Sequence, residues 1–313
     1  MVSEDAQKSI KRYSSLGSLI KALYFNPSKD AKFRVLLQRL NYNFALKFNP
    51  KIKNAKYEEL YLGETRTLKI TTPKSDPNKI MLYFHGGAYI VGNPESYKSL
   101  VGHLADITGT TVYVPDYRLA PENKFPSALE DALDATNQIF MNSEELNFDK
   151  NKVVVCGDSA GGNLALLISI YSKIKIVPKI HGQILIYPWV DFTMSRPSIN
   201  IELNGILVNK KTLLYFADHY LKNENDITDW RISPILFPDL SDLPPTYIFG
   251  AGIDPLVDEG EALSRRLRSF NNEVHYKLYP GQMHAFVSNI VSLPTSLECI
   301  HEICESILKI LNK

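Results

Sequence analysis

Residues 157–161 read Gly-Asp-Ser-Ala-Gly, the G-x-S-x-G pattern in which a serine hydroxyl can serve as a nucleophile. The pentapeptide directly follows an apolar run ending at Cys156 and directly precedes a helical pattern. Such a tight turn forces Ser159 into a strained backbone conformation, which the small flanking residues tolerate, and places its hydroxyl at the positive end of a helix. We therefore predict that Ser159 is the nucleophile of an acyl transfer rather than a helix cap.

A serine nucleophile needs a histidine to take its proton and a carboxylate to orient that histidine. With this turn, the chain order is serine, acid, histidine. We predict His284 as the base because it lies in a loop beyond the last predicted strand, and Asp254 as the acid because it follows the penultimate strand and precedes a stiffening proline. Asp258, at the start of a predicted helix, is the alternative acid. The histidines interpreted as surface or packing residues are His181, His219, His275 and His301.

Residues 85–88, His-Gly-Gly-Ala, follow a second apolar strand pattern. Consecutive glycines allow backbone N–H groups to converge on one oxygen. We predict an oxyanion hole formed by the N–H groups of Gly87, Ala88 and Ala160, on the condition that φ of Ala88 is negative. A plain tight turn is the alternative.

Four side chains beside these motifs have predicted supporting roles. His85 and Asp158 are expected to brace the two turns through hydrogen bonds rather than to carry protons. The aromatic side chains of Tyr89 and Trp189 fit either the acyl pocket or core packing, and the sequence leaves both interpretations open.

The chain between these motifs alternates strand and helix patterns, which predicts a mostly parallel sheet of about eight strands flanked by helices. The predicted strands are 57–62, 67–72, 79–84, 111–114, 152–156, 183–187, 246–249 and 274–278. The predicted helices are 16–24, 30–48, 97–108, 126–141, 160–171, 210–221, 259–270 and 296–311. The interval 190–244 is too long for an ordinary crossover. We therefore divide the chain into N-terminal cap helices (1–56), a core in two parts (57–189 and 233–313) and a cap insertion (190–232).

The composition of this 313-residue chain limits the classes of function that it can have. The chain has 44% hydrophobic residues, 35 Lys or Arg and 34 Asp or Glu, which indicates a globular protein and excludes general nucleic-acid binding. Residues 1–56 carry 12 basic and 3 acidic residues, so we expect a basic lid docked on an acidic body. Attraction of anionic substrates or lipid surfaces is the alternative. Three cysteines, no signal-peptide pattern and no long apolar run predict a cytoplasmic protein without stable membrane insertion.

Taken together, the motifs resemble the hormone-sensitive-lipase-like family of α/β-hydrolases, which includes bacterial carboxylesterases and arylacetamide deacetylases. Residues 85–88 resemble its HGGG motif and residues 157–161 its GDSAG motif. The other similar segments are 116–122 (Asp-Tyr-Arg-Leu-Ala-Pro-Glu), 125–126 (Phe-Pro), 187–189 (Tyr-Pro-Trp), 254–256 (Asp-Pro-Leu) and 280–286 (Pro-Gly to His-Ala-Phe). The resemblance implies an α/β-hydrolase fold with a helical cap, the same triad and oxyanion hole, and no metal or organic cofactor.

We accordingly expect a serine carboxylesterase acting on short- to medium-chain acyl esters. The alternatives are an amidase or formamidase using the same triad, a non-catalytic ligand-binding receptor of the same fold, and an interfacial lipase. The expected partner is a small-molecule ester, and a homodimer is left open.

Overall fold

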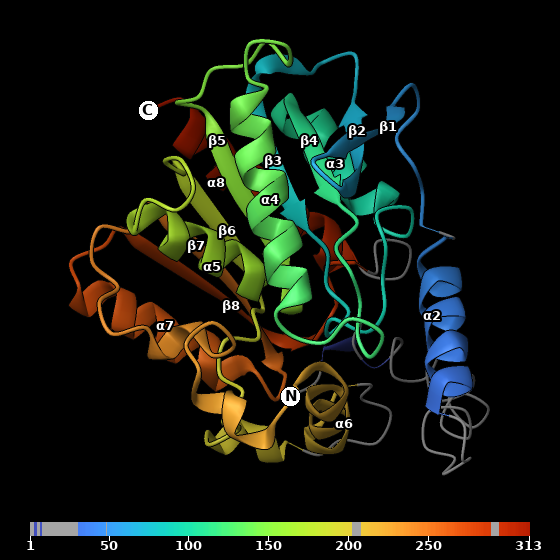
Figure 1. Ribbon diagram of the computed structural model, residues 1–313, viewed down its shortest axis with the longest axis vertical. Coiled ribbons are helices and arrows are strands. Elements are labelled where there is room, and N and C mark those ends of the chain that lie inside the picture. The colour runs from blue at the N-terminus through green and yellow to red at the C-terminus, as the bar shows by residue number, and fades with distance from the viewer. Residues whose placement is uncertain (1–2, 5–6, 8–30, 48, 202–207, 289–293) are drawn as a thin grey trace.

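The computed structural model describes residues 3, 4, 7, 31–47, 49–201, 208–288 and 294–313. The helix predicted at 16–24 lies outside these residues. Figure 1 shows the arrangement of the described elements, which are named as labelled there.

One eight-stranded sheet organises the molecule, with strand order β1-β2-β4-β3-β5-β6-β7-β8. The strands are β1 (Lys56–Leu62), β2 (Thr65–Thr71), β3 (Asp76–Phe84), β4 (Thr110–Pro115), β5 (Val153–Asp158), β6 (Gly182–Ile186), β7 (Thr246–Ile253) and β8 (Val274–Met283). Among the strand pairs in the described residues, β1–β2 and β2–β4 are antiparallel and the other five are parallel. The prediction of a mostly parallel sheet of about eight strands is confirmed.

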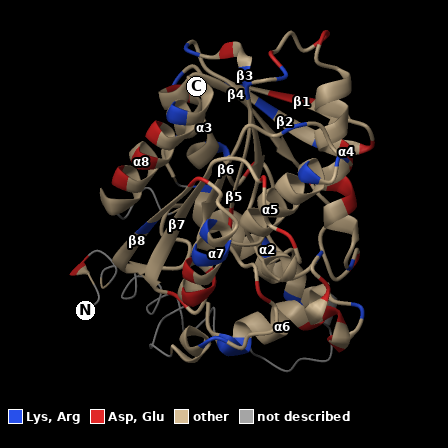
Figure 2. Cartoon of the chain, turned by 90° about the vertical axis from the view of Figure 1, so that its left-hand side faces the viewer, with Lys and Arg blue, Asp and Glu red and all other residues tan. Residues whose placement is uncertain are grey.

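Helices cover both faces of the sheet (Figure 2). Along β3, the alternating side chains belong to two separate clusters: Leu82 and Phe84 pack on one face, and Met81 and Tyr83 on the other. The first face is covered by α4 (Ser127–Met141), α5 (Ala160–Lys173) and α7 (Val257–Ser269), and the second by α3 (Lys98–Thr108) and α8 (Pro294–Leu311). Because both faces are buried, the central strands are apolar throughout rather than alternating.

Figure 1 shows α2 (Ala31–Lys47) along the right-hand side of the molecule and α6 (Lys210–Tyr220) at its lower end. The Tyr215 hydroxyl on α6 donates to Oε1 of Gln38 on α2 at 3.4 Å. Asn209 begins α6 as a capping residue, because its side chain accepts the Thr212 N–H at 3.1 Å. Residues 190–232 also contain the short 3₁₀ helices η1 (Pro197–Asn200) and η2 (Glu224–Thr228), and η3 (Pro234–Leu236) follows them.

The helices in the described ranges include none with both the length and the apolar character required to cross a bilayer.

Candidate active site

Ser159 lies at the turn between β5 and α5 in a strained conformation, with φ 55° and ψ −119°. The neighbouring glycines make this turn sterically accessible. A Cβ at Gly157 would lie 2.2 Å from the carbonyl oxygen of Gly161, and a Cβ at Gly161 would lie 1.9 Å from that of Phe84. Any side chain at either position would displace the backbone of the turn. The spacing of the pentapeptide therefore reflects the close approach of backbone segments around Ser159.

The side chains of Ser159, His284 and Asp254 meet at the carboxyl ends of β5, β7 and β8. Nε2 of His284 is 2.9 Å from Oγ of Ser159, and Nδ1 is 2.6 Å from Oδ2 of Asp254. Asp254 is fully buried, and its Oδ1 accepts the N–H of Leu256 at 2.9 Å. The Asp254 side chain is therefore held from two sides, and the geometry suits proton transfer from serine to histidine.

The alternative acid, Asp258, and two of the remaining histidines, His219 and His275, have other partners. Asp258 lies in the first turn of α7 and accepts the N–H of Ser198 at 2.8 Å. His275 is exposed on β8 and stacks on Tyr247, with ring centroids 4.4 Å apart. His219 approaches the carbonyl oxygen of Tyr215 on its own helix at 2.9 Å. Of the residues the structure describes, His284 is the histidine that contacts Ser159.

The loop after β3 has an unusual run of positive φ angles: Gly87 at 118°, Ala88 at 53° and Tyr89 at 63°. The condition set for Ala88, a negative φ, is therefore wrong. The turn closes when the N–H groups of Ile90 and Val91 both donate to the Gly87 carbonyl oxygen at 2.9 Å, and this turn carries Ala88 into the left-handed region.

The three predicted oxyanion donors are available for a ligand. No hydrogen bond with any described residue occupies the N–H groups of Gly87, Ala88 or Ala160. Ala160 is the first residue of α5, where the N–H has no helical partner and the helix dipole favours negative charge. A negative oxygen forming beside Ser159 would therefore meet uncommitted donors.

Asp158 joins the turn that carries Ser159 to the loop after β3. Its carboxylate accepts hydrogen bonds from the Tyr83 hydroxyl at 2.8 Å, the Gly86 N–H at 2.8 Å and the Tyr97 hydroxyl at 3.0 Å. Burial raises the pKa of Asp158, and these three donors oppose that shift. Sequence reasoning anticipated the bracing role of Asp158 but missed Tyr83 and Tyr97, which have no local motif.

His85 is fully buried beside this connection. Its Nδ1 lies 2.8 Å from the Gly86 carbonyl oxygen, and its ring stacks on Tyr117 with centroids 4.3 Å apart. Burial lowers the pKa of His85, so its neutral form is favoured. These contacts suit a residue that supports the loop.

The two candidate pocket aromatics lie in stacked pairs. Tyr89 stacks on Tyr220 of α6 and Trp189 stacks on Phe192, each pair with centroids 3.9 Å apart. Tyr89 is 1% exposed and Trp189 is 0% exposed. Packing between the core and residues 190–232 is the role these contacts favour.

Helix α2 is attached to the same loop, a connection that the sequence pattern did not reveal. Arg39 donates from Nε to the Ile90 carbonyl oxygen and from Nη2 to that of Ala120, both at 2.8 Å, and pairs with Glu122 at 2.7 Å. The Tyr42 hydroxyl lies 2.7 Å from that of Tyr97. Arg39–Glu122 is a contact of the kind expected between a basic N-terminal segment and an acidic body.

The described residues contain no group of three or more His, Cys, Asp or Glu side chains arranged to hold a metal ion. The three cysteines, Cys156, Cys299 and Cys304, are buried free thiols.

Comparison with known proteins places this geometry in a family. The family described as alpha/beta hydrolase fold matches residues 81–288. Ethyl acetate hydrolase of Pseudomonas putida is 34% identical over 232 residues, which cover 72% of this chain and 72% of that protein. An arylesterase of Saccharolobus solfataricus is 32% identical over 241 residues, covering 73% of this chain and 78% of the other.

A solved esterase structure matches a larger share of this chain than the sequence relatives do. A hyperthermophilic esterase from Pyrobaculum calidifontis superposes with a TM-score of 0.82 at 29% identity, covering 93% of this chain and 97% of the other. The chain therefore belongs to the α/β-hydrolases, within the hormone-sensitive-lipase-like group that its motifs resemble.

Proposed function

We propose that the protein is a serine carboxylesterase that hydrolyses short- to medium-chain acyl esters through an acyl-enzyme. The observation that carries the proposal is the continuous contact from Asp254 through His284 to Ser159, at 2.6 Å and 2.9 Å. The relatives support the ester class, because those compared above are named for ethyl acetate and aryl ester hydrolysis.

In the proposed mechanism, Ser159 attacks the ester carbonyl carbon while its proton passes to Nε2 of His284. The carbonyl oxygen becomes negative and accepts hydrogen bonds from the N–H groups of Gly87, Ala88 and Ala160. Asp254 holds the proton of His284 on Nδ1 and stabilises the imidazolium. His284 then protonates the departing alkoxide, and the acyl-enzyme is hydrolysed by a water molecule that the same histidine deprotonates.

The cap is proposed to select the ester. Residues 1–56 and 190–232 contribute α2 and α6, and α2 contacts the loop that carries Gly87 through Arg39. We place the enzyme in the cytoplasm, a proposal supported by its three free thiols.

The test is hydrolysis of p-nitrophenyl butyrate by the wild type and by Ser159→Ala. We expect a fall in kcat on the order of 10⁶-fold, as for removal of a serine nucleophile elsewhere. Ser195→Ala is the matched control, because that hydroxyl is exposed and, within the described part of the chain, forms its hydrogen bond with Thr193 at 2.9 Å. If Ser159→Ala is as active as the wild type, Ser159 is not the nucleophile.

A fluorophosphonate probe separates an enzyme from a ligand-binding receptor of the same fold. Covalent labelling of the wild type but not of Ser159→Ala is expected, whereas absence of an adduct on the wild type favours the receptor. Acyl chains from acetate to decanoate, with matched anilides, then test chain length and the amidase alternative.

A further inference from the structure

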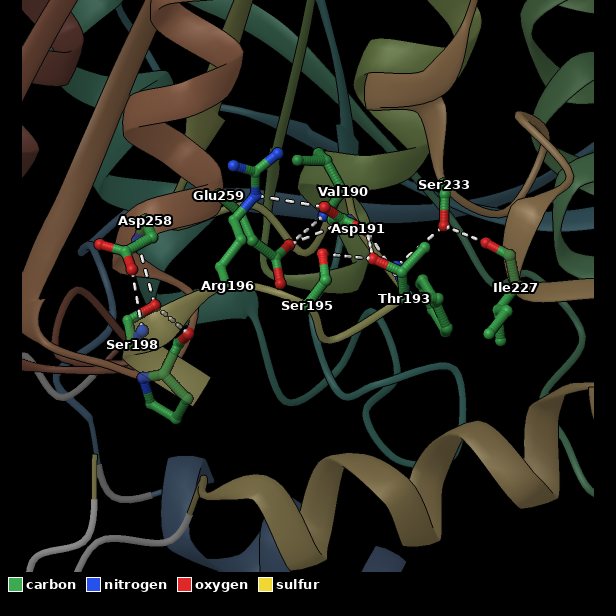
Figure 3. A network of polar contacts seen from close by, with 12 residues as sticks. Val190, Asp191, Thr193, Ser195, Arg196, Ser198, Ile227, Ser233, Asp258 and Glu259 are labelled. Atoms are coloured by element: carbon green, nitrogen blue, oxygen red, sulfur yellow. Dashed lines mark hydrogen bonds and ion pairs between the residues drawn. The ribbon is translucent and has the colours of Figure 1, made fainter. Parts of the chain in front are cut away.

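Two consecutive carboxylates in the first turn of α7 bind backbone N–H groups of the insertion at two separate points (Figure 3). Oε2 of Glu259 accepts the N–H of Val190 at 2.9 Å and that of Asp191 at 3.0 Å. Oδ2 of Asp258 accepts the N–H of Ser198 at 2.8 Å. Glu259 is 2% exposed, so the two N–H groups that it accepts have little access to water as an alternative partner.

The same turn of α7 continues directly from the loop that carries Asp254. The Val257 N–H donates to the Asp254 backbone oxygen at 3.1 Å, and the Leu256 N–H donates to its side chain at 2.9 Å. The Ser198 hydroxyl donates to the backbone oxygen of Pro255 at 2.7 Å. The insertion is therefore fastened to the acid loop as well as to the helix.

The segment held by Glu259 also contacts the nucleophile and the base. The Trp189 N–H donates to the backbone oxygen of Ser159 at 3.1 Å. The Tyr187 ring packs against the His284 ring, with centroids 4.8 Å apart. Residues 187–191 thus form a strap that contacts Ser159 and His284 at one end and Glu259 at the other.

We propose that Asp258 and Glu259 are positioning residues that clamp this strap to the Asp254 loop and so keep the acid, the base and the nucleophile in register. The proposal rests on the function proposed above for the three side chains.

Glu259 acts in this clamp as a hydrogen-bond acceptor rather than as a charge. Its carboxyl group is buried near the carboxylates of Asp191 and Asp254, and Asp258 adjoins it on α7. The nearby cation, Arg196, pairs with Asp191 at 3.2 Å. Burial raises the pKa of Glu259 well above its usual value; the N–H groups of Val190 and Asp191 oppose this shift, and the negative charges of Asp191 and Asp254 add to it. A glutamine at this position keeps the accepting carbonyl oxygen, whereas an alanine leaves both backbone N–H groups without an acceptor.

The experiment measures kcat and KM for p-nitrophenyl butyrate in Glu259→Ala and Glu259→Gln. For Glu259→Ala we expect kcat to fall about 10- to 100-fold, the cost of misplacing reacting groups by up to ~1 Å. KM should change less than kcat, and Glu259→Gln should restore kcat to within about threefold of wild type. Glu261→Ala is the matched control, because Glu261 is on the same helix with a half-exposed side chain and pairs with Arg265.

A second variant, Ser198→Ala, tests the clamp without removing a buried acceptor of two N–H groups. It deletes the donor to the Pro255 oxygen, and we expect a smaller fall in kcat, severalfold. Wild-type kcat in both Ser198→Ala and Glu259→Ala would overturn the proposal, and so would a Glu259→Gln variant as impaired as a folded Glu259→Ala. If Glu259→Ala does not fold, the kcat values of Ser198→Ala and Glu259→Gln test the proposal.

The Ser159 and Glu259 variants together distinguish a failure of the clamp from a failure of the proposed function. A failure of the clamp leaves Ser159→Ala inactive while the Glu259 variants match the wild type. A failure of the proposed function leaves Ser159→Ala active whatever the Glu259 variants do.

Discussion

Replacing Asp254 by asparagine should remove catalysis while preserving the fold. The two carboxylate oxygens have different partners: Oδ1 accepts the Leu256 N–H at 2.9 Å and Oδ2 faces Nδ1 of His284 at 2.6 Å. An asparagine has only one accepting oxygen. If that oxygen stays on Leu256, the amide NH₂ donates to Nδ1 and moves the histidine proton to Nε2, where it faces Ser159 and blocks proton transfer.

The opposite amide orientation restores the productive tautomer but places the NH₂ against the Leu256 N–H. That leaves a donor unpaired at a fully buried site, at a cost of about 1–3 kcal/mol. The unproductive tautomer should therefore dominate. We expect kcat to fall about 10⁴-fold, which is ~5.4 kcal/mol of transition-state stabilisation.

The assay is kcat for p-nitrophenyl butyrate, with urea unfolding to verify the fold. Asp218→Asn is the control, because the Asp218 side chain is 83% exposed on α6. If folded Asp254→Asn retains kcat within tenfold of the wild type, the tautomer argument and the assignment of Asp254 as the acid are both refuted.

Three further predictions concern stability and its link to the site. Gly161→Ala should destabilise the fold by about 3 kcal/mol, the upper end of the usual cost of overpacking, because the new methyl would lie 1.9 Å from a backbone oxygen. In urea unfolding, the control Gly260→Ala, with 3.7 Å of clearance on a helix, should instead match or exceed the stability of the wild type. Tyr97→Phe should cost about 1–3 kcal/mol and lower kcat, since its hydroxyl donates to buried Asp158; unchanged unfolding and unchanged kcat would contradict that role. The pKa of Glu259 is raised above 4.5 in the folded protein, so above that pH folding takes up a proton and the stability of the wild type falls as the pH rises. The stability of Glu259→Gln relative to the wild type should therefore increase between pH 5 and pH 8. A difference in stability that does not change with pH would mean that Glu259 is ionised in the folded protein.

Local patterns predicted most elements of the fold. The eight strands and the helices of the described residues fall close to their predicted ranges, because apolar runs and turn residues signal them within a few positions. The 3₁₀ helices η1, η2 and η3 were not predicted, since segments this short carry no periodicity. The fold class, the family and the ester-hydrolase class are confirmed by the comparisons. The roles of individual site residues stay predictions that the variants above test.

The backbone of the loop after β3 shows where local reasoning failed. A negative φ at Ala88 is what an alanine ordinarily adopts, and the sequence contains no sign of the exception. The value of 53° arises because the N–H groups of Ile90 and Val91 close the turn on Gly87. Hydrogen bonds from this loop to Asp158 and Tyr97, and from Arg39 to the loop, then hold a conformation that the residue alone would avoid.

By itself, the sequence determined the order of the chemical groups along the chain: a serine between glycines, an acid before a proline, and a histidine after the last strand. These are properties of neighbouring residues, and a strand-to-helix turn imposes them locally. Only the tertiary structure decided that Glu259 accepts Val190 and Asp191 and that Tyr97 meets Asp158, because these partners lie 69, 68 and 61 positions apart. Contacts over such separations arise when the sheet has brought its strand ends together, and no spacing within one segment encodes them.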